Sequence, residues 1–498
     1  MIGWLAIVAA GLTLHLLRKL KPKMASLAFA GLMMIFLLVD FSWVATTTYH
    51  GGYVFAVWIL FSALFSWPFI FYAYGYFRAK KSCFNLVFFS LTMALIEWLR
   101  LYFLSGYPFS PLGLFLDQTF LFQPVVSSFG IYGLSACFMA LAIAIDHALH
   151  QSYRSLLALG FLAPMLLGCV KWDEKELKTA SIALIQPGRE LDQKSWMPSS
   201  LRQPIPLIQQ LKALLQLMKQ AGAPDVDLIV MPEGVFGGWV NEPFIPSLLW
   251  LQLIEEVFAI GANPASCPSV LTQKEAMRFL ADHLQATMIY GSSTYDSLGR
   301  AYNGLFFQPP FSDCLEYYKR ILVPMGEYLP LDSVRSLASR YGVGGFFSPG
   351  KELIFDTGSF QILPSICYED CFPRFLWSSS TVDADLIVNI TNDGWFYPSA
   401  LPKRHAQLAR LRSVEWGCPI VRACEQEMSG IADADGSCRF FPAKEKIEKI
   451  QIAWKPRATL YRWLGNRWIP LAWIACAGGQ LILFFIRRKH LVLKRTVD

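Results

Sequence analysis

The chain has 498 residues, enough for two or three domains, and a net charge of +7 at pH 7. Its charged fraction of 16% lies well below the roughly 25% of soluble proteins, while 54% of its residues are hydrophobic. This composition excludes an ordinary soluble protein and indicates a membrane protein. The apolar residues are concentrated in 1–171 and 468–486, whereas the segment between them has a globular composition.

Seven apolar runs come close to the ~20 residues that a helix needs to cross a bilayer. They cover residues 2–17, 25–47, 53–76, 84–104, 124–146, 155–171 and 468–486. No basic region precedes the first run and no small-residue cleavage site follows it. We therefore expect a retained helix there and not a signal peptide.

Basic residues predict the orientation of these helices, because short cytoplasmic loops accumulate Lys and Arg. They follow the first, third and seventh runs and separate the fifth from the sixth: Arg18, Lys19, Lys21, Lys23, Arg78, Lys80, Lys81, Arg154, Arg487, Arg488, Lys489, Lys494 and Arg495. With seven spans and an outer N-terminus, all of them face the cytoplasm and residues 172–467 lie outside. The net positive charge then reflects membrane topology, and we expect no nucleic-acid partner.

The outer segment alternates strands with helices. Short runs rich in Ile and Val predict buried strands at 181–185, 227–231, 286–290, 360–366 and 385–390. Helical patterns cover 205–220, ending at Gly222, and 402–416, ending at Gly417. "DADG" at 433–436 predicts a hairpin turn. This alternation predicts an α/β fold with helices packed on a sheet.

Three of the strands end in reactive side chains. "DLIVMPEG" ends in Glu233, "CLEYYKR" contains Lys319, and "FQILPSICYED" places Cys367 at the end of an apolar run. Ligands bind outside the carboxyl ends of strands in open α/β sheets, so these groups can share one pocket. A thiol needs a base to become a nucleophile, and a nearby cation or helix N-terminus lowers its pKa. Each residue alone is more often structural, but the combination favours an active site.

The same segments resemble a known family. "MPEG", "YYKRILVPMGEYLP" and "SICYED" are similar to the three motifs of the nitrilase superfamily, whose triad is Glu, Lys and Cys. The flanking membrane helices and "LVPMGEYLP" narrow the resemblance to the apolipoprotein N-acyltransferase family. Further pieces carry it over nearly the whole chain: "EWLRLYFLSGYPF" at 97–109, "WMP" at 196–198, "VNITNDGWF" at 388–396 and "RHAQLARLRSVE" at 404–415.

The resemblance implies an architecture of three parts: a helical membrane domain of about six spans at 1–171, a periplasmic catalytic domain at 172–467, and a membrane helix with a basic cytoplasmic tail at 468–498. The fold class is α/β, with the catalytic domain forming a nitrilase-like αββα sandwich. The location it implies is the cell inner membrane.

The resemblance also implies roles for individual residues. Glu233 is expected to be the general base, Lys319 to stabilise the oxyanion and the thiolate, and Cys367 to be the nucleophile. The supporting positions are Trp196, Glu327, Tyr368 and Glu369. Glu327 follows Lys319 by eight residues, so it can hold the ammonium or act as a second carboxylate.

The implied reaction moves an acyl chain from a phospholipid to the N-terminal amine of a diacylglyceryl-cysteine apolipoprotein, by a ping-pong route through a cysteine thioester. Membrane lipids surround the enzyme, a monomer is expected, and the reaction needs no cofactor and no metal. The outer domain contains only His283 and His405 and no C-x-x-C pair, so a zinc site there is not expected.

Two features depart from the family. Its members commonly have eight spans, which leaves either a further helix before Met1 or a shorter protein. The stretch "VRACEQEMSG" at 421–430, with Glu425 and Glu427, replaces a segment usually richer in Asn and Thr. The hydrogen bonding around the site is therefore left open at this position.

Two other functions remain as alternatives. A membrane-tethered nitrilase-type amidase would use water as its second substrate, although one helix would suffice to anchor it. A transporter or receptor would favour charges inside the spans. The main ones found, Asp40, Glu97 and Arg100, lie near helix ends.

Overall fold

The computed structural model divides into two compact units. It describes residues 2–46, 52–103, 106–153, 160, 177–189, 205–222, 225–259, 268–324, 326–329, 347–373, 384–442 and 446–495. The first unit comprises Met1–Ala45, Gly51–Trp172 and Ala458–Asp498, and the second comprises Thr46–His50 and Asp173–Arg457. We call them the membrane unit and the catalytic unit, after the roles that the sequence leads us to expect.

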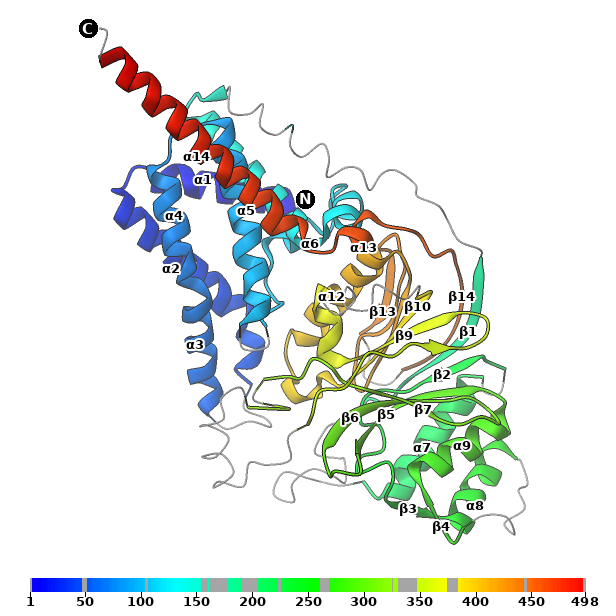
Figure 1. Ribbon diagram of the computed structural model, residues 1–498. Helices are drawn as coiled ribbons and strands as arrows, with labels where there is room; N and C mark the ends of the chain where they lie inside the picture. Colours follow the sequence, from blue (N-terminus) through cyan, green and yellow to red (C-terminus); the bar gives the residue numbers. More distant parts are fainter. Residues whose placement is uncertain are drawn as a thin grey trace. The chain divides into compact units, whose positions relative to one another are not determined.

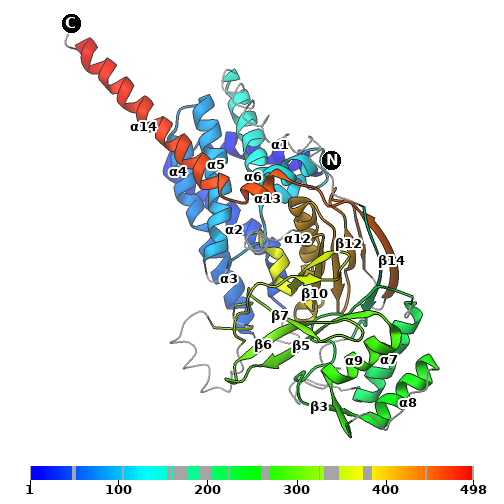
Figure 2. The same ribbon diagram turned by 45° about the vertical axis from the view of Figure 1, so that its right-hand side comes forward.

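The described part of the membrane unit is helical (Figures 1 and 2). Its α-helices are α1 (Ile2–Leu17), α2 (Pro22–Asp40), α3 (Tyr53–Ser66), α4 (Pro68–Arg78), α5 (Cys83–Leu99), α6 (Phe122–Leu149), α13 (Leu460–Leu464) and α14 (Trp468–Arg495). Short 3₁₀ helices are η1 (Ser42–Val44), η2 (Arg100–Tyr102) and η3 (Leu112–Leu116).

Four of these helical segments are long and apolar enough to cross a membrane: Pro22–Asp40, Val54–Arg78, Cys83–Tyr102 and Phe122–Leu149. Two shorter apolar helices, Ile2–Leu17 and Trp468–Ile482, match the first and last expected runs. The third expected run contains both α3 and α4. Trp67 lies between them with helical backbone angles, and Pro68 is the first residue of α4. The sixth expected run, 155–171, lies outside the described residues.

Helix α6 is the most buried helix described in the membrane unit. It packs against α1, α5, η3 and α13, and it is kinked at Gly130, where φ is 67°. The close contact with η3 requires Gly113, since a Cβ atom there would lie 2.7 Å from the Ile131 carbonyl oxygen. The end of α1 lies beside the end of α6, where His15 Nδ1 is 3.2 Å from His150 Nδ1.

The catalytic unit contains two six-stranded sheets. The first has the order β14 (Lys446–Trp454), β1 (Lys178–Gln186), β2 (Leu228–Val230), β5 (Thr287–Tyr295), β6 (Ala301–Gln308), β7 (Leu315–Tyr318). The second has the order β13 (Cys438–Phe441), β12 (Ser429–Ala432), β11 (Ile420–Cys424), β10 (Leu386–Thr391), β9 (Gln361–Ile366), β8 (Phe355–Asp356). Each sheet has three neighbouring parallel strands near its centre. They are β1, β2 and β5 in the first sheet and β9, β10 and β11 in the second.

Helices cover both outer faces of the paired sheets (Figure 1). Helices α7 (Leu207–Gln220) and α9 (Gln273–Leu284) pack on the first sheet, with α8 (Ser247–Phe258) beside α7. Helix α12 (Leu401–Trp416) packs on the second sheet. Strand β1 lies against β11 and β12, and β6 lies against β9. The layers are therefore αββα, as the resemblance to the nitrilase superfamily implies. A minor sheet, β3 (Pro243–Pro246) and β4 (Val270–Thr272), adjoins α8 and α9.

The expected elements of this unit are confirmed. The five apolar runs form β1, β2, β5, β9 and β10, and the two helical patterns form α7 and α12. Gly222 and Gly417 follow these helices with φ of 82° and 71°, a conformation that glycine adopts without a steric cost. The "DADG" segment forms the turn between β12 and β13.

Candidate active site

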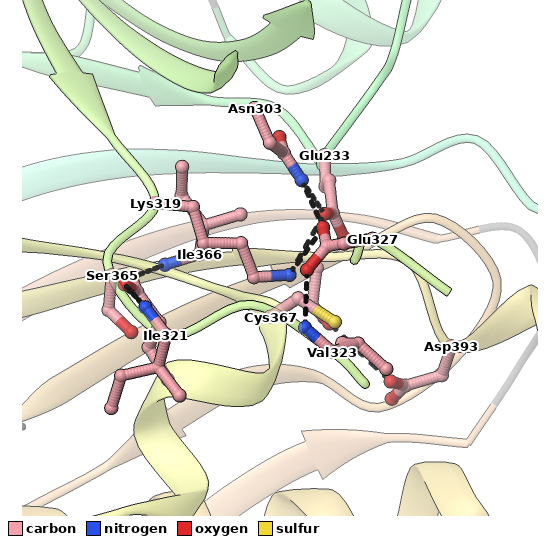
Figure 3. Close-up of polar contacts among 12 residues, drawn as sticks. Glu233, Asn303, Lys319, Ile321, Val323, Glu327, Ser365, Ile366, Cys367 and Asp393 are labelled. Atoms are coloured by element: carbon pink, nitrogen blue, oxygen red, sulfur yellow. Dashed lines mark hydrogen bonds and ion pairs between the residues drawn. The ribbon is translucent and has the colours of Figure 1, made fainter. Parts of the chain in front are cut away.

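The three residues of the expected triad come from three different strand ends and lie together (Figure 3). Glu233 follows β2, Lys319 follows β7, and Cys367 begins the 3₁₀ helix η7 (Cys367–Cys371) directly after β9. The first two belong to one sheet and the third to the other. The site therefore lies where the two sheets meet, at residues that are far apart in the sequence.

Lys319 is the centre of a compact polar cluster. Its side chain is 1% exposed, and its Nζ lies 2.9 Å from Glu327 Oε1 and 3.6 Å from Glu233 Oε1. Burial alone would lower the pKa of this ammonium, but Glu327 and Glu233 raise it well above its usual value. Lys319 is therefore a permanent cation held between two carboxylates.

Asn303, on β6, joins the two carboxylates. Its Nδ2 donates to Glu233 Oε1 at 2.6 Å and to Glu327 Oε1 at 2.8 Å. The backbone N–H of Val323 donates to the other oxygen of Glu327 at 2.7 Å. These bonds hold both carboxylates in one orientation around the ammonium (Figure 3).

The position of Glu233 depends on a glycine in the neighbouring strand. Gly291 of β5 donates its backbone N–H to the Pro232 carbonyl at 3.3 Å. A Cβ atom at this position would lie 2.6 Å from the Glu233 Cα, well inside van der Waals contact. Glycine is therefore required for the turn that carries Glu233 to pass so close to β5.

Cys367 adopts an unusual backbone conformation. Its φ is +49°, in the left-handed region that residues other than glycine rarely occupy. Its carbonyl oxygen lies 3.2 Å from Asn389 Nδ2, which donates to it, and 3.1 Å from His405 Nε2. Such strain persists where the surrounding structure holds it. Figure 3 shows the Cys367 sulfur in the same cluster as Lys319 and Glu327.

A buried network of charges lies behind Cys367. His405 Nε2 lies 2.7 Å from Asp370 Oδ1, and its Nδ1 lies 2.8 Å from Asp393 Oδ1. Arg422 donates to the same two carboxylates at 3.0 Å and 2.7 Å. Burial and Arg422 would lower the pKa of His405, but Asp370 and Asp393 raise it well above its usual value. Two cations thus face two carboxylates.

The thiol itself departs from the expectation drawn from sequence. Desolvation and the Glu233 carboxylate raise the pKa of Cys367 above its usual value, and Lys319 offsets only part of this effect. We expected the cation and the following helix to lower that pKa. The helix is a single 3₁₀ segment of five residues, too short to stabilise a thiolate strongly. The resting cysteine is therefore a thiol that needs a base.

Glu369 connects the nucleophile to the loop that carries Lys319. Its buried carboxylate accepts hydrogen bonds from the Tyr317 hydroxyl at 2.9 Å and from the backbone N–H groups of Arg320 at 2.5 Å and Ile366 at 2.8 Å. Burial raises the pKa of Glu369 to about 6. This side chain fixes the end of β9 against the end of β7.

The remaining expected residues have different outcomes. Glu327 lies in the cluster with Lys319. Tyr368 is half-buried, and its ring packs edge-on against Phe372 at 4.8 Å between centroids. Trp196 lies outside the described residues.

Glu425, whose effect the sequence left open, forms an ion pair between the sheets. Arg189, after β1, donates through Nε to Glu425 Oε1 at 2.8 Å and through Nη2 to the Val235 carbonyl at 2.8 Å. Val235 follows Glu233 by two residues. The departure from the family at 421–430 therefore supplies a partner for Arg189 close to the turn of Glu233, and Glu427 is only half-buried.

Sequence reasoning did not assign five residues of the site: Asn303, Asp370, Asp393, His405 and Arg422. Asp393 and His405 lie in the "VNITNDGWF" and "RHAQLARLRSVE" segments, so those motifs contained a usable signal. Asn303 stands in an ordinary strand sequence, "AYNGLFF", and only the pairing of β6 with β7 places it beside Lys319.

Comparisons with known proteins match both units. Residues 182–463 match the carbon-nitrogen hydrolase family, and residues 1–144 match the apolipoprotein N-acyltransferase N-terminal domain. Apolipoprotein N-acyltransferase of Chlamydia pneumoniae is 28% identical over 426 residues, covering 80% of this chain and 75% of that protein. The protein of the same name from Vibrio vulnificus is 26% identical over 450 residues, covering 86% and 80%.

Solved structures similar to this chain include a CN-hydrolase superfamily protein of Xanthomonas campestris and Nit3 of Saccharomyces cerevisiae. The first is 19% identical with a TM-score of 0.38 and covers 55% of this chain and 91% of that one. The second is 16% identical with a TM-score of 0.38 and covers 58% and 93%. The first family match alone spans more than half of the chain, and the N-terminal match adds the membrane unit. The chain therefore belongs to the carbon-nitrogen hydrolase family, in its apolipoprotein N-acyltransferase branch.

Proposed function

We propose that this chain N-acylates the N-terminal diacylglyceryl-cysteine of apolipoproteins, taking the acyl chain from a phospholipid and carrying it as a thioester on Cys367. The observation that supports this most is the union in one chain of a Glu, Lys and Cys cluster with a membrane unit similar to the N-terminal domain of these acyltransferases. Both substrates are lipid-anchored, which gives the membrane helices a purpose beyond tethering.

The first half-reaction loads the enzyme. Glu233 takes the proton of Cys367, and the sulfur attacks the ester carbonyl carbon of the phospholipid. The negative charge that develops on the carbonyl oxygen is stabilised by Lys319. The ester bond breaks, the lysophospholipid leaves with the proton that Glu233 returns, and the acyl thioester remains.

The second half-reaction transfers the acyl group from Cys367 to the lipoprotein. The α-amine of the lipoprotein attacks the thioester carbon, Glu233 takes a proton from the amine, and the thiolate of Cys367 leaves as the amide forms. The thiolate then recovers its proton. Glu327 and Asn303 keep Lys319 and Glu233 in place through both steps, while Glu369, Tyr368 and Trp196 support the site.

We assign residues 172–467 to a periplasmic catalytic domain of an inner-membrane, multi-pass protein that acts as a monomer. Residues 1–171 and 468–498 form the membrane part. The reaction requires that water be kept away from the thioester, which would otherwise be hydrolysed.

The decisive experiment uses purified protein with phospholipid alone. We expect an acyl adduct on Cys367, visible by intact mass and removed by neutral hydroxylamine, which then passes to a diacylated lipopeptide when this is added. Glu233→Gln should slow loading by ~10²–10⁴-fold, as for loss of a general base. Lys319→Ala should slow it by roughly 10²–10³-fold, as for loss of an oxyanion donor. Glu327→Gln should weaken loading without abolishing it.

A different result identifies the amidase. If the adduct is lost to water as fast as it forms and lipopeptide makes no difference, the enzyme is a hydrolase and the transferase proposal is wrong. Cys367→Ala is the blank for the adduct, because it lacks the sulfur while all other cysteines remain.

A further inference from the structure

Three side chains of the membrane unit bring metal-binding atoms together at the junction of α1 and α6. His15 lies near the end of α1, Asp146 in the last turn of α6, and His150 directly after that helix. One imidazole nitrogen of each histidine and one oxygen of the carboxylate lie within 4.8 Å of one another. This cluster is separate from the candidate active site, which belongs to the catalytic unit.

The spacings suit a small divalent ion. His15 Nδ1 lies 3.2 Å from His150 Nδ1, and His150 Nδ1 lies 3.2 Å from Asp146 Oδ1. With bonds of about 2.0 Å, two ligands of a tetrahedral zinc ion lie ~3.3 Å apart. Both distances are close to this spacing, and all three ligand atoms lie within 4.8 Å of one another.

The carboxylate has one satisfied oxygen and one unsatisfied oxygen. Asp146 is fully buried, and its Oδ2 accepts from Arg18 Nε at 2.6 Å and from the Tyr76 hydroxyl at 2.5 Å. Its Oδ1 receives no hydrogen bond from the described residues and lies 3.2 Å from His150 Nδ1. A buried, unpaired carboxylate oxygen is costly, and a metal ion would satisfy it. Donors on the second oxygen of a ligating carboxylate are a common feature of metal sites.

We infer that His15, Asp146 and His150 bind a transition-metal ion, for which Zn²⁺ is the natural probe, and that the ion ties α1 to the end of α6. Imidazole and carboxylate ligands favour zinc, nickel or copper over magnesium or calcium. The side chain of His150 is 28% exposed, which gives the ion a route to the site. This inference does not depend on the proposed acyl transfer.

Two neighbouring groups set the expected affinity. Arg18 shares the carboxylate with the ion, and its positive charge opposes binding. Without metal, a proton on His150 Nδ1 can be donated to the Asp146 carbonyl oxygen at 2.8 Å, and the ion must replace it. We therefore expect weaker binding than at a four-ligand structural zinc site.

A second group, Asp370, Cys371 and His405, has similar spacing in the catalytic unit. There Arg422 and a charged His405 already neutralise the carboxylates, and both cations repel a metal ion. Of these two groups of described residues, only His15, Asp146 and His150 are therefore suited to a metal ion.

The test measures Zn²⁺ binding to the full chain, purified in detergent through a tag without histidine and treated with chelator. Equilibrium dialysis with metal analysis should give about one Zn²⁺ per chain. His15→Ala, His150→Ala and Asp146→Asn should each weaken this binding by at least ~10-fold. His283→Ala, which removes a histidine of α9, is the matched control and should leave it unchanged. Co²⁺ in the same site should give the visible absorption of a low-coordinate ion.

Zinc should also raise the melting temperature of the wild-type protein but not that of the His15→Ala/His150→Ala double variant. A folded double variant, judged by its size-exclusion profile, that binds Zn²⁺ as tightly as wild type would overturn the proposal. So would the absence of saturable binding to the wild-type chain. If the double variant does not fold, His15→Gln alone, at a half-buried position, provides the same comparison.

Discussion

At the scale of single residues, the surroundings of Lys319 determine what it can do. Glu327 and Glu233 keep the Lys319 ammonium charged in spite of its burial, so it cannot serve as the base of the reaction. In the proposed reaction it is instead a fixed positive charge that interacts with Cys367 and stabilises the oxyanion. The proton of the thiol must then go to a carboxylate, and Glu233 is the one that the resemblance to the family assigns.

Asn303 is the first residue whose removal tests this arrangement. Asn303→Ala removes the donor shared by Glu233 and Glu327. A hydrogen bond to a charged group contributes about 1.5–3 kcal/mol, so we expect acyl loading of Cys367 to slow by ~10–100-fold. Asn241→Ala, which removes a donor to Thr294 Oγ1 outside the cluster, is the control. Equal rates for the two variants would show that the carboxylates hold their positions without Asn303.

Cys371 provides a second test. Its thiol is buried in η7, and burial raises its pKa, so it should stay protonated and take no part in the chemistry. Cys371→Ala should therefore retain most of the acyl transfer, measured as triacylated lipopeptide. A loss as large as that of Cys367→Ala would mean that the two thiols act together, and the single-nucleophile mechanism would need replacement.

At the scale of elements, η7 is positioned by its neighbours. Cys367 has a left-handed backbone, and Glu369 accepts a hydrogen bond from the loop after β7. Asp370 is paired with His405 of α12 and Arg422 of β11. None of these contacts is local in sequence. The segment is therefore held from both sheets and from one helix, which keeps the sulfur in one place.

The ion pairs of His405 make the stability of the catalytic unit depend on pH. The pKa of His405 is raised in the folded state, so its stabilisation is fully present below the unfolded pKa of ~6.5 and is lost as pH rises towards the folded value. His405→Gln should destabilise the protein by roughly 3–5 kcal/mol at pH 6, as when a buried pair loses one partner. The difference in stability between His405→Gln and the wild type should be smaller at pH 9 than at pH 6.

Thermal unfolding of both proteins across this range measures the effect. His283→Gln, at a histidine whose ring stacks on Phe279 away from this network, is the matched control and should show little change with pH relative to wild type. A deficit for His405→Gln that grows from pH 6 to pH 9 would contradict the assignment of a charged imidazole.

At the scale of the whole molecule, the orientation in the membrane stays a prediction. The distribution of Lys and Arg predicts the result of labelling with an impermeant thiol reagent added from outside. The reagent should label single cysteines placed between residues 172 and 467, but not cysteines placed at 78–81 or after 487. The single cysteines should be introduced into a variant that lacks the reactive native cysteines. Labelling at 490 from outside would disprove the seven-span arrangement and the periplasmic position of the active site.

Much of this molecule is determined by local sequence. Apolar runs of membrane length, basic loops, and buried strands rich in Ile and Val each carry their signal within a few tens of residues, and the αββα fold and the membrane helices are confirmed. The family was also readable from sequence, because "MPEG", "YYKRILVPMGEYLP" and "SICYED" each keep a reactive residue next to a strand.

The tertiary structure alone decided how those residues are held. Asn303 reaches Lys319 because β6 pairs with β7, and His405 reaches Cys367 because α12 packs beside η7. The raised pKa of the thiol follows from desolvation, which depends on every neighbour that excludes water, and no sequence spacing reports it. The cluster of His15, Asp146 and His150 has the same origin, since it exists only because the first helix of the chain lies against the sixth.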